Sequence, residues 1–360
     1  MNKKKRLLFF IQNGVGGAER MTINIAKLLP TSDWDITICK VSMPFIVQNG
    51  RIDDFIPKEF KLTNIYWSGQ ISFIRQLWKI IRKFNPHIVF SSVMPYNQRL
   101  LLISPFFKKI KFIVRNDNYL FTINRLKRFS LKQTYKRASA IIAQTEEMKE
   151  ELCLLGLNPR KIIVLHNLID KELISTKASE PSPFPQNNKA RFVSVGRLAP
   201  QKGFDILIKA FEQVVEHIPD SELYIIGSYD GEGQKVYREL NALTAQLNIK
   251  DKVHFTGYTE NPYKYMKNAS VYVLSSRYEG LPNVLVEAQF LKTPAAAVKC
   301  IPMISRMIKD GVNGFLAKPE DPDSLAEAMI NAVGMKDVNF VYKSSTKEDF
   351  IQVFSNVNEL

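Results

Sequence analysis

Hydrophobic residues in the first half of the chain form short continuous runs that alternate with helical periodicity. Runs of four to six apolar residues bounded by turns are typical of strands buried on both faces of a sheet, and spacings of three and four indicate helices. Strands alternating with helices predict a parallel α/β sheet. The predicted strands are residues 7–11, 36–41, 87–91, 111–114, 140–143 and 162–165, and the predicted helices are 18–29, 71–84, 124–137 and 146–155.

The pattern breaks once and then restarts. Residues 179–188 contain three prolines and show no periodicity, which is typical of a linker. Strands are predicted again at residues 191–195, 223–226, 253–255, 271–274 and 295–298, with a helix at 204–218. We therefore expect an N-terminal α/β domain at 1–178, a linker at 179–190, a C-terminal α/β domain at 191–335, and a segment at 336–360 that packs back on the first domain.

Length and composition agree with this division. The 360 residues are 45% hydrophobic and 24% charged, as in globular proteins, and about 150 residues per domain suggest two domains. No apolar run approaches the ~18 residues of a membrane span. The three cysteines have no metal-ligand spacing and favour a reducing compartment, so we expect a cytoplasmic protein.

The net charge of +15 is confined to the first half. Residues 1–180 contain 30 Lys and Arg against 14 Asp and Glu, whereas residues 181–360 contain 20 against 21. One basic cluster lies on the predicted helix at 124–137, interleaved with Leu126, Phe129 and Leu131. Such a helix suits an anionic membrane surface or a phosphate-bearing substrate, with a merely solvated face as the alternative. No nucleic-acid recognition motif accompanies it, so we expect no nucleic acid partner.

A glycine-rich turn, residues 14–19, joins the first strand to the first helix. Gly16 and Gly17 would let an anion approach the backbone at the helix N-terminus. The turn resembles a dinucleotide fingerprint only in part, because Glu19 occupies the last glycine position and no acidic residue ends the second strand. A nicotinamide-dependent oxidoreductase is therefore a disfavoured alternative.

A second turn, residues 196–203, opens the second half. Arg197 and Lys202 lie five residues apart on a glycine-bounded loop, where two cations could bind one diphosphate. Cations at a helix start oppose the helix dipole, which disfavours a purely structural role.

The third element follows the strand at 271–274. Pro282 predicts a helix start, which would leave the N–H groups of Asn283, Val284 and Leu285 unpaired as an anion site. Glu279 precedes the helix and Glu287 lies just over one turn inside it. Two carboxylates flanking a phosphate site are suited to accepting hydrogen bonds from sugar hydroxyls.

These motifs resemble those of the family 4 glycosyltransferases, which are retaining, use nucleotide sugars and have the two-domain GT-B fold. The resemblance covers residues 6–333 and rests on residues 16–19, 196–204 and 275–287. Within the family the chain is most similar to transferases that extend lipopolysaccharide, capsule or other lipid-linked oligosaccharides.

The resemblance implies a role for each motif residue. Arg197 and Lys202 would neutralise the donor diphosphate, Glu279 would contact the donor sugar and Glu287 the ribose. Tyr258 falls where such enzymes hold the base. Other donor contacts would come from Gly16, Gly17, Gly280, Leu281, Asn283, Val284 and Leu285, and acceptor or transferred-sugar contacts from Glu19, Arg115 and Asn116.

The implied reaction moves a hexose or N-acetylhexosamine from a nucleotide diphosphate sugar, with UDP as the expected carrier, to a lipid-linked saccharide. No metal or other cofactor is expected, and the basic N-terminal domain would bind the inner face of the cell membrane. A carbohydrate- or nucleotide-binding protein without transfer activity is the other alternative. The chain departs from the family where Arg115 and Asn116 stand in place of a histidine and where residues 299–305 replace a glycine-rich stretch.

Overall fold

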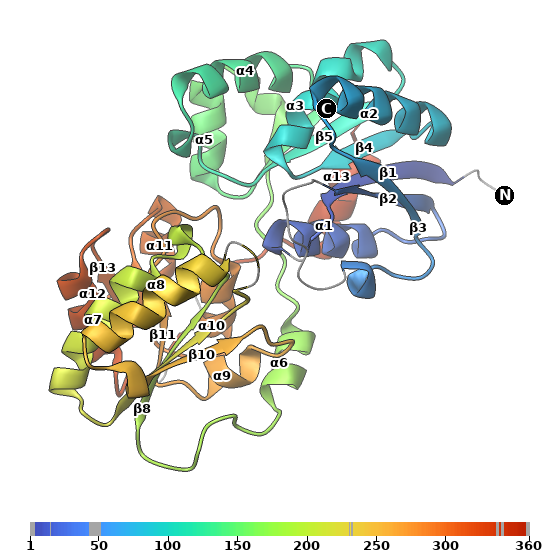
Figure 1. The fold of residues 1–360 in the computed structure, drawn as a ribbon. Helices are drawn as coiled ribbons and strands as arrows, with labels where there is room; N and C mark the ends of the chain where they lie inside the picture. Colours follow the sequence, from blue (N-terminus) through green and yellow to red (C-terminus); the bar gives the residue numbers. More distant parts are fainter. Residues whose placement is uncertain are drawn as a thin grey trace. The chain divides into compact units, whose positions relative to one another are not determined.

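The computed structural model describes residues 4–14, 16–42, 52–229, 231, 233–335, 338–339 and 342–357. The chain forms two compact units (Figure 1), of which unit 1 is Met1–Leu168 with Ser344–Leu360 and unit 2 is Ile169–Lys343. Each unit is described by itself. Val15 of the first turn, residues 1–3 and part of the segment at 336–360 lie outside the described residues.

The boundary between the units differs from the predicted one. Helix α6 (Lys171–Ala178) was assigned to the first domain, but it belongs to unit 2. It packs there on α9 (Tyr263–Lys267), and the side-chain amide of Asn261 donates a 2.8 Å hydrogen bond to the carbonyl of Lys177. The proline-rich segment at 179–188 is thus a loop inside unit 2 rather than the connection between units.

Unit 1 contains a parallel sheet with the strand order β3-β2-β1-β4-β5-β6-β7 among the described residues. Its strands are β1 (Lys5–Gln12), β2 (Trp34–Ser42), β3 (Lys61–Tyr66), β4 (Ile88–Ser91), β5 (Lys111–Asn116), β6 (Ala140–Ala143) and β7 (Ile162–Val164). Its longer helices are α1 (Gly17–Leu28), α2 (Gln70–Phe84), α3 (Met94–Ile103), α4 (Arg125–Tyr135), α5 (Glu146–Leu154) and α13 (Lys347–Ser355). The strands expected from continuous apolar runs are all present.

The C-terminal helix α13 completes the core of unit 1. Its Phe354 ring lies 5.9 Å from the ring of Phe9 on β1 and 5.6 Å from that of Phe90 on β4, and Phe350 is buried beside it. The helix begins with a capping box in which Thr346 and Asp349 bond each other's backbone N–H groups. Sequence-distant residues therefore close one face of the first sheet.

Unit 2 contains a second parallel sheet with the order β10-β9-β8-β11-β12-β13. Its strands are β8 (Ala190–Val195), β9 (Ser221–Ile226), β10 (Val253–Gly257), β11 (Val271–Leu274), β12 (Ala295–Val298) and β13 (Gly314–Ala317). Its other helices are α7 (Phe204–His217), α8 (Gly233–Gln246), α10 (Asn283–Phe290), α11 (Pro302–Met307) and α12 (Pro322–Ala332). In the described part of the chain, no helix has the length and apolar composition needed to cross a bilayer.

Both strand orders reverse direction at the first strand of the unit. In unit 1 the chain leaves β1 toward β2 and later returns to its other side at β4, and in unit 2 it does the same at β8 with β9 and β11. Ligands of open parallel sheets bind at the carboxyl ends of the strands at such a reversal. In unit 2 this point lies between the loops that follow β8 and β11.

Candidate functional site

The loops after β8 and β11 are tied together by hydrogen bonds inside unit 2. The hydroxyl of Ser275 donates to the carbonyl of Lys202 at 2.8 Å, and the backbone N–H of Arg277 donates to the carbonyl of Gln201 at 2.8 Å. The side-chain amide of Gln201 in turn donates to the carbonyl of Tyr278 at 2.9 Å. Two motifs that are about 75 residues apart in the sequence thus form one structure at the sheet edge.

Two glycines permit this close approach. Gly203 has φ +60°, and a Cβ there would overlap the carbonyl oxygen of Ser275. A Cβ at Gly227, which follows β9, would overlap the carbonyl of Gly196. The sequence analysis missed Gly227, although a glycine directly after a buried strand at the same sheet edge was the available signal.

Lys202 and Glu279 form an ion pair at the centre of the joined loops. The ammonium of Lys202 donates to Glu279 Oε1 at 2.7 Å, and the hydroxyl of Ser276 donates to the same oxygen at 2.7 Å. Both side chains are largely buried. Because both bonds fall on Oε1, the carboxylate is fixed in orientation, and no bond to Oε2 occurs among the described residues. The arrangement leaves one carboxylate oxygen to accept a hydrogen bond from a ligand hydroxyl.

The two arginines near these loops differ in their surroundings. Arg197 is exposed, and its guanidinium has no partner among the described residues. Arg277 donates two hydrogen bonds to Asp205, at 2.9 and 2.7 Å, and a third to Glu320 at 2.8 Å. Burial raises the pKa of Asp205, but the hydrogen bonds and charge of Arg277 outweigh it and lower that pKa overall. Arg277 therefore holds the loop in place, and Arg197 is the cation available to an anionic ligand.

The start of helix α10 corrects one prediction. The N–H of Asn283 donates to the carbonyl of Leu281 at 2.9 Å, and the N–H of Leu285 donates to that of Pro282 at 3.0 Å. A tight turn around Pro282, which precedes the helix, satisfies both groups locally. Of the three predicted free N–H groups, only that of Val284 has no backbone partner in the described part of the chain.

Glu287 lies on α10, and Tyr263 donates a 3.4 Å hydrogen bond to its Oε1. The charges of both glutamates affect the pKa of the buried Tyr272 hydroxyl on β11. Burial raises the pKa of Tyr272, and the negative charges of Glu279 and Glu287 raise it further.

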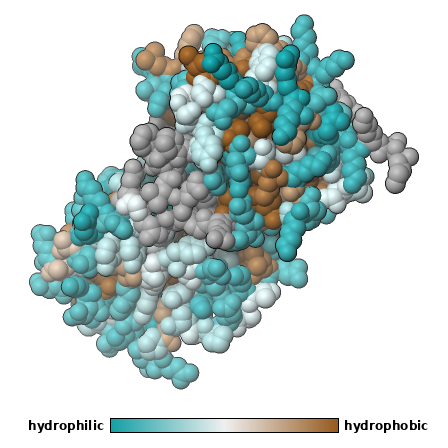
Figure 2. Space-filling view, turned by 45° about the vertical axis from the view of Figure 1, so that its right-hand side comes forward, coloured by the Kyte–Doolittle hydropathy of each residue, from teal (hydrophilic) through white to brown (hydrophobic). Residues whose placement is uncertain are grey.

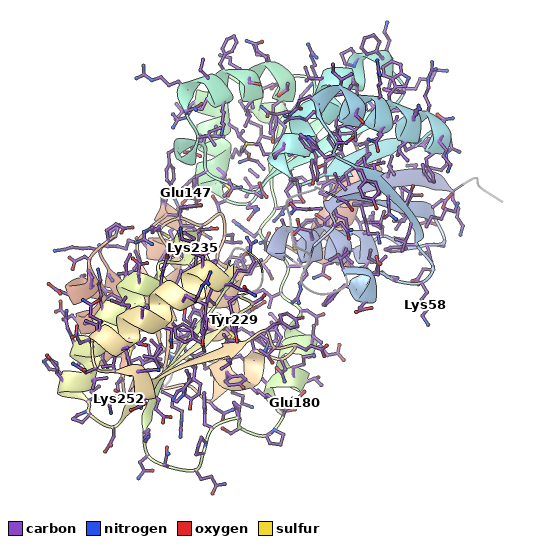
Figure 3. All side chains as sticks on the ribbon, viewed as in Figure 1. Lys58, Glu147, Glu180, Tyr229, Lys235 and Lys252 are labelled. Atoms are coloured by element: carbon purple, nitrogen blue, oxygen red, sulfur yellow. The ribbon has the colours of Figure 1, made fainter. Side chains whose placement is uncertain are left out.

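Tyr258 follows β10 and is half-exposed. Gly257 before it has φ +75°, and a Cβ there would lie 3.7 Å from the ring of Tyr229. Tyr229 (labelled in Figure 3) stacks on Tyr237 with ring centroids 4.6 Å apart. The loop thus presents aromatic side chains beside a glycine with positive φ, and the described contacts do not connect it to Glu287.

In unit 1, Gly16 of the glycine-rich turn lies close to the carboxylate of Glu19 in the first helix. Gly16 caps α1, and a Cβ there would overlap the carboxylate of Glu19, which is nearly buried and folds back toward the helix start. A carboxylate in the first turn is favourable for the helix dipole. Thr22 and Ser92 share a 2.7 Å hydrogen bond that links α1 to the segment after β4.

Arg115 and Asn116 end β5, and both side chains are buried. Arg115 donates to the side chain of Asn167, and the amide of Asn116 donates to the carbonyl of Asn118 at 2.7 Å. Asp117, to which the sequence analysis assigned no role, directly follows them. Burial raises the pKa of Asp117 to about 6, and the charge of Arg115 opposes that rise.

Two Rossmann-like units, each with a loop and helix at the strand reversal, define the GT-B architecture of nucleotide-sugar transferases. Two family models match the chain, "Glycosyltransferase Family 4" over residues 15–173 and "Glycosyl transferases group 1" over residues 175–347. Together the two models span almost the whole chain, and the chain therefore belongs to the glycosyltransferases that combine these two domains.

Characterised relatives match over most of their length. The chain is 26% identical to an N-acetylgalactosamine-N,N'-diacetylbacillosaminyl-diphospho-undecaprenol 4-alpha-N-acetylgalactosaminyltransferase of Campylobacter jejuni, covering 94% of this chain and 93% of that protein. It is also 26% identical to a UDP-Gal:alpha-D-GlcNAc-diphosphoundecaprenol alpha-1,3-galactosyltransferase of Escherichia coli, covering 92% and 88%.

Solved structures share the fold. HepE of Anabaena in complex with UDP superposes with a TM-score of 0.78 at 18% identity, covering 99% of this chain and 100% of that one. The lipopolysaccharide outer core galactosyltransferase WaaB superposes with a TM-score of 0.68 at 18% identity, with the same coverage.

Proposed function

We propose that this chain is a retaining, metal-independent glycosyltransferase that moves a hexose or N-acetylhexosamine from a UDP-sugar to a lipid-linked oligosaccharide or polysaccharide precursor. The acceptor class is supported by the two relatives whose names describe diphospho-undecaprenol substrates. The UDP carrier is supported by the galactosyltransferase relative and by the UDP complex of the structural neighbour. Both relatives' names specify an alpha linkage.

The Lys202–Glu279 pair is the observation that carries the proposal. A cation and a carboxylate fixed 2.7 Å apart can bind the two chemically different parts of a nucleotide sugar. Lys202 would bind the diphosphate together with the exposed Arg197 and the N–H of Val284. Glu279 would accept a sugar hydroxyl at Oε2. Positive groups aimed at the diphosphate stabilise the charge that develops when the bond to the sugar breaks.

The remaining donor and acceptor contacts extend from this pair. Glu287 would bind the ribose and Tyr258 the base, both in unit 2. In unit 1, Glu19 would be the least buried of the three expected acceptor contacts, at 8% exposure, whereas Arg115 and Asn116 are 1% exposed and would act by positioning the loop after β5.

A donor screen tests the reaction. The purified protein is incubated with a panel of UDP- and other nucleotide-linked hexoses and N-acetylhexosamines and a polyprenyl-diphosphate-linked sugar acceptor. We expect UDP release that requires the acceptor, an alpha-linked product by NMR, and an unchanged rate in EDTA. A beta-linked product would refute retention, loss of activity in EDTA would refute metal independence, and nucleotide binding without transfer would favour the binding-protein alternative.

We also propose that unit 1 binds an anionic membrane at the inner face of the cell through α4. Leu126 and Phe129 share one face of this helix and are 81% and 63% exposed. The structure corrects two details of the expected surface. Leu131 is fully buried, so it belongs to the core, and Arg128 is half-buried with its Nε donating to the carbonyls of Leu120 and Ile123.

The exposed cations on α4 and just after it are Arg125, Lys127, Lys136 and Arg137, and the first three are the ones to change. Each basic side chain near an anionic bilayer contributes about 1 kcal/mol, and salt screens the attraction. Reversing these three charges to Glu should abolish sedimentation with phosphatidylglycerol vesicles at low salt and leave UDP binding unchanged. Wild-type protein that ignores such vesicles would favour a soluble acceptor.

A further inference from the structure

The middle of unit 1 is almost free of carboxylates. Residues 60–145 contain 16 Lys and Arg but a single acid, Asp117, which is half-buried at the end of β5. This stretch includes α2, α3 and α4, which pack on one another in sequence order (Figure 1). The next helix, α5, begins with two glutamates and contains four in all. The outer surfaces of α2 and α4 therefore carry exposed cations and no carboxylate, whereas the one cation of α3, Arg99, is half-buried against Trp67.

A second apolar point lies on this surface, apart from α4. Phe106 is 71% exposed in the short 3-10 helix η2 (Ser104–Phe106), which directly follows α3. Its ring lies 5.1 Å from the ring of Trp78 on α2, and that of Phe107 lies 4.8 Å from Trp78. The guanidinium of Arg82 lies 5.5 Å from the same indole. We call these four residues the η2 tip.

Further cations lie next to the η2 tip in the sequence or on the segment that it ends. Besides Arg82 of the tip itself, the exposed ones are Lys79, Lys83, Lys108, Lys109 and Arg137. In Figure 2 hydrophobic side chains, in brown, reach the surface of unit 1 between hydrophilic ones, in teal. An exposed aromatic ring that packs on two partly buried ones and is bordered by Lys and Arg matches the interface of a bilayer, where rings lie at headgroup level and cations meet lipid phosphates.

The η2 tip and the exposed face of α4 lie at opposite ends of α4. Arg137, just beyond the C-terminal end of α4, donates a 3.3 Å hydrogen bond to the carbonyl of Leu102 near the end of α3. Leu126 is 11 residues earlier, which corresponds to about 16 Å along a helix. The two apolar points are thus well separated, yet both fit within the footprint of one domain.

We propose that the η2 tip is a second point of contact with an anionic bilayer, which fixes the orientation of unit 1 on the surface. This inference rests on the proposed membrane binding through α4. A single contact would leave the unit free to rotate, whereas two contacts along α4 align the strands with the membrane plane. The carboxyl edge of the sheet, where α4 begins, then opens along the surface on which a lipid-linked acceptor presents its sugars.

Trp78 provides a direct reporter. The chain contains three tryptophans, so Trp34→Phe and Trp67→Phe leave Trp78 as the sole indole. We expect its fluorescence to be quenched by vesicles of brominated phosphatidylcholine and phosphatidylglycerol at low salt. Phe106→Ser should weaken vesicle partitioning about tenfold. Because the Phe106 ring is largely exposed in the free protein, its removal should cost little stability, but it removes the free energy that the ring gains on transfer into the bilayer interface.

Leu154→Ser is the matched control. Leu154 is 88% exposed, more than Phe106, but it lies on the acidic helix α5, so its replacement should leave partitioning unchanged. Leu126→Ser with Phe129→Ser separates this inference from the proposed α4 contact. Wild-type protein that fails to sediment with vesicles overturns both.

If the α4 variant loses vesicle binding while Phe106→Ser binds like the wild type and Trp78 is not quenched, only the contact through the η2 tip is overturned. Equal partitioning to neutral phosphatidylcholine vesicles overturns the assignment to an anionic surface. Quenching of Trp78 together with weakened partitioning of Phe106→Ser, and not of Leu154→Ser, supports the second contact.

Discussion

Replacing Lys202 by alanine should impair stability and catalysis by separable amounts. In the wild type, Glu279 Oε1 accepts bonds from Lys202 and Ser276, both at 2.7 Å, in a largely buried setting. Lys202→Ala removes the counter-charge and leaves only the hydroxyl. A hydrogen bond to a charged group contributes about 1.5–3 kcal/mol, and breaking a fully buried pair costs about 3–5 kcal/mol. Because Lys202 is partly exposed, we expect about 2 kcal/mol.

The change is measurable by calorimetry. A loss of about 2 kcal/mol corresponds to a fall of roughly 4–8 °C in the melting temperature of a unit of this size. The transfer rate should fall by about 10²–10³, since a positive group aimed at the leaving diphosphate is lost. The double variant Lys202→Ala with Glu279→Gln removes the uncompensated charge, so it should regain most of the stability while its rate stays low.

Lys235→Ala is the control for simple loss of a lysine in unit 2. Lys235 lies on α8 (Figure 3), is highly exposed, and is 3.8 Å from Glu239. Exposed pairs of this kind contribute about 0–1 kcal/mol, so neither melting temperature nor rate should change appreciably. Near-wild-type turnover of Lys202→Ala would refute its role at the diphosphate, and a double variant as unstable as the single one would refute the charge argument.

Three further changes test other parts of the molecule. Glu287→Ala should weaken UDP binding in a calorimetric titration, whereas Glu279→Ala should lower mainly sugar-dependent turnover, and equal weakening of UDP binding would reject the division of roles. The raised pKa of Asp117 means that the folded state binds its proton more tightly than the unfolded state, so the stability of the wild type falls as pH rises from about 4 to about 6. In urea unfolding, Asp117→Asn should therefore be more stable than the wild type by up to about 3 kcal/mol at pH 7.5 and by little at pH 4. A difference that does not depend on pH would contradict this. Gly203→Ala should destabilise more than Gly311→Ala in thermal unfolding, because both have positive φ but only Gly203 would collide with backbone; equal losses would show that the positive φ alone matters.

The sequence predicted the fold where local pattern and tertiary environment agree. Strands such as β1, β4 and β11 are buried on both faces, so their apolar runs are continuous and visible. Strand β3 was missed because it lies at the sheet edge and five of its six residues are partly or fully exposed. Helix α3 was missed because its apolar residues merge with those of the following segment at 104–107, which hides a helical period.

Motif spacing identified the loops of the candidate site, but not the contacts within them. Side-chain chemistry at a strand end indicates which loop is suited to binding an anion, as at Arg197 and Lys202. Whether an N–H group is free depends on the turn that precedes the helix, and at Pro282 that turn satisfies two of the three predicted groups. Likewise, the phase of α4 decides which leucine faces solvent, and the sequence alone could not distinguish Leu126 from Leu131.

The hydrogen bonds that build the candidate donor site all lie inside unit 2. Ser275, Gln201 and Arg277 join its two loops without any residue of unit 1, and the basic excess of the chain lies outside them. Salt should therefore weaken the electrostatic interactions of these two parts of the molecule to different degrees. It should screen the exposed cations on α2 and α4 within a Debye length of about 8–10 Å, and it should act far less on the largely buried Lys202–Glu279 pair. Membrane affinity that falls more steeply with salt than UDP affinity does is the behaviour that this separation of charges requires.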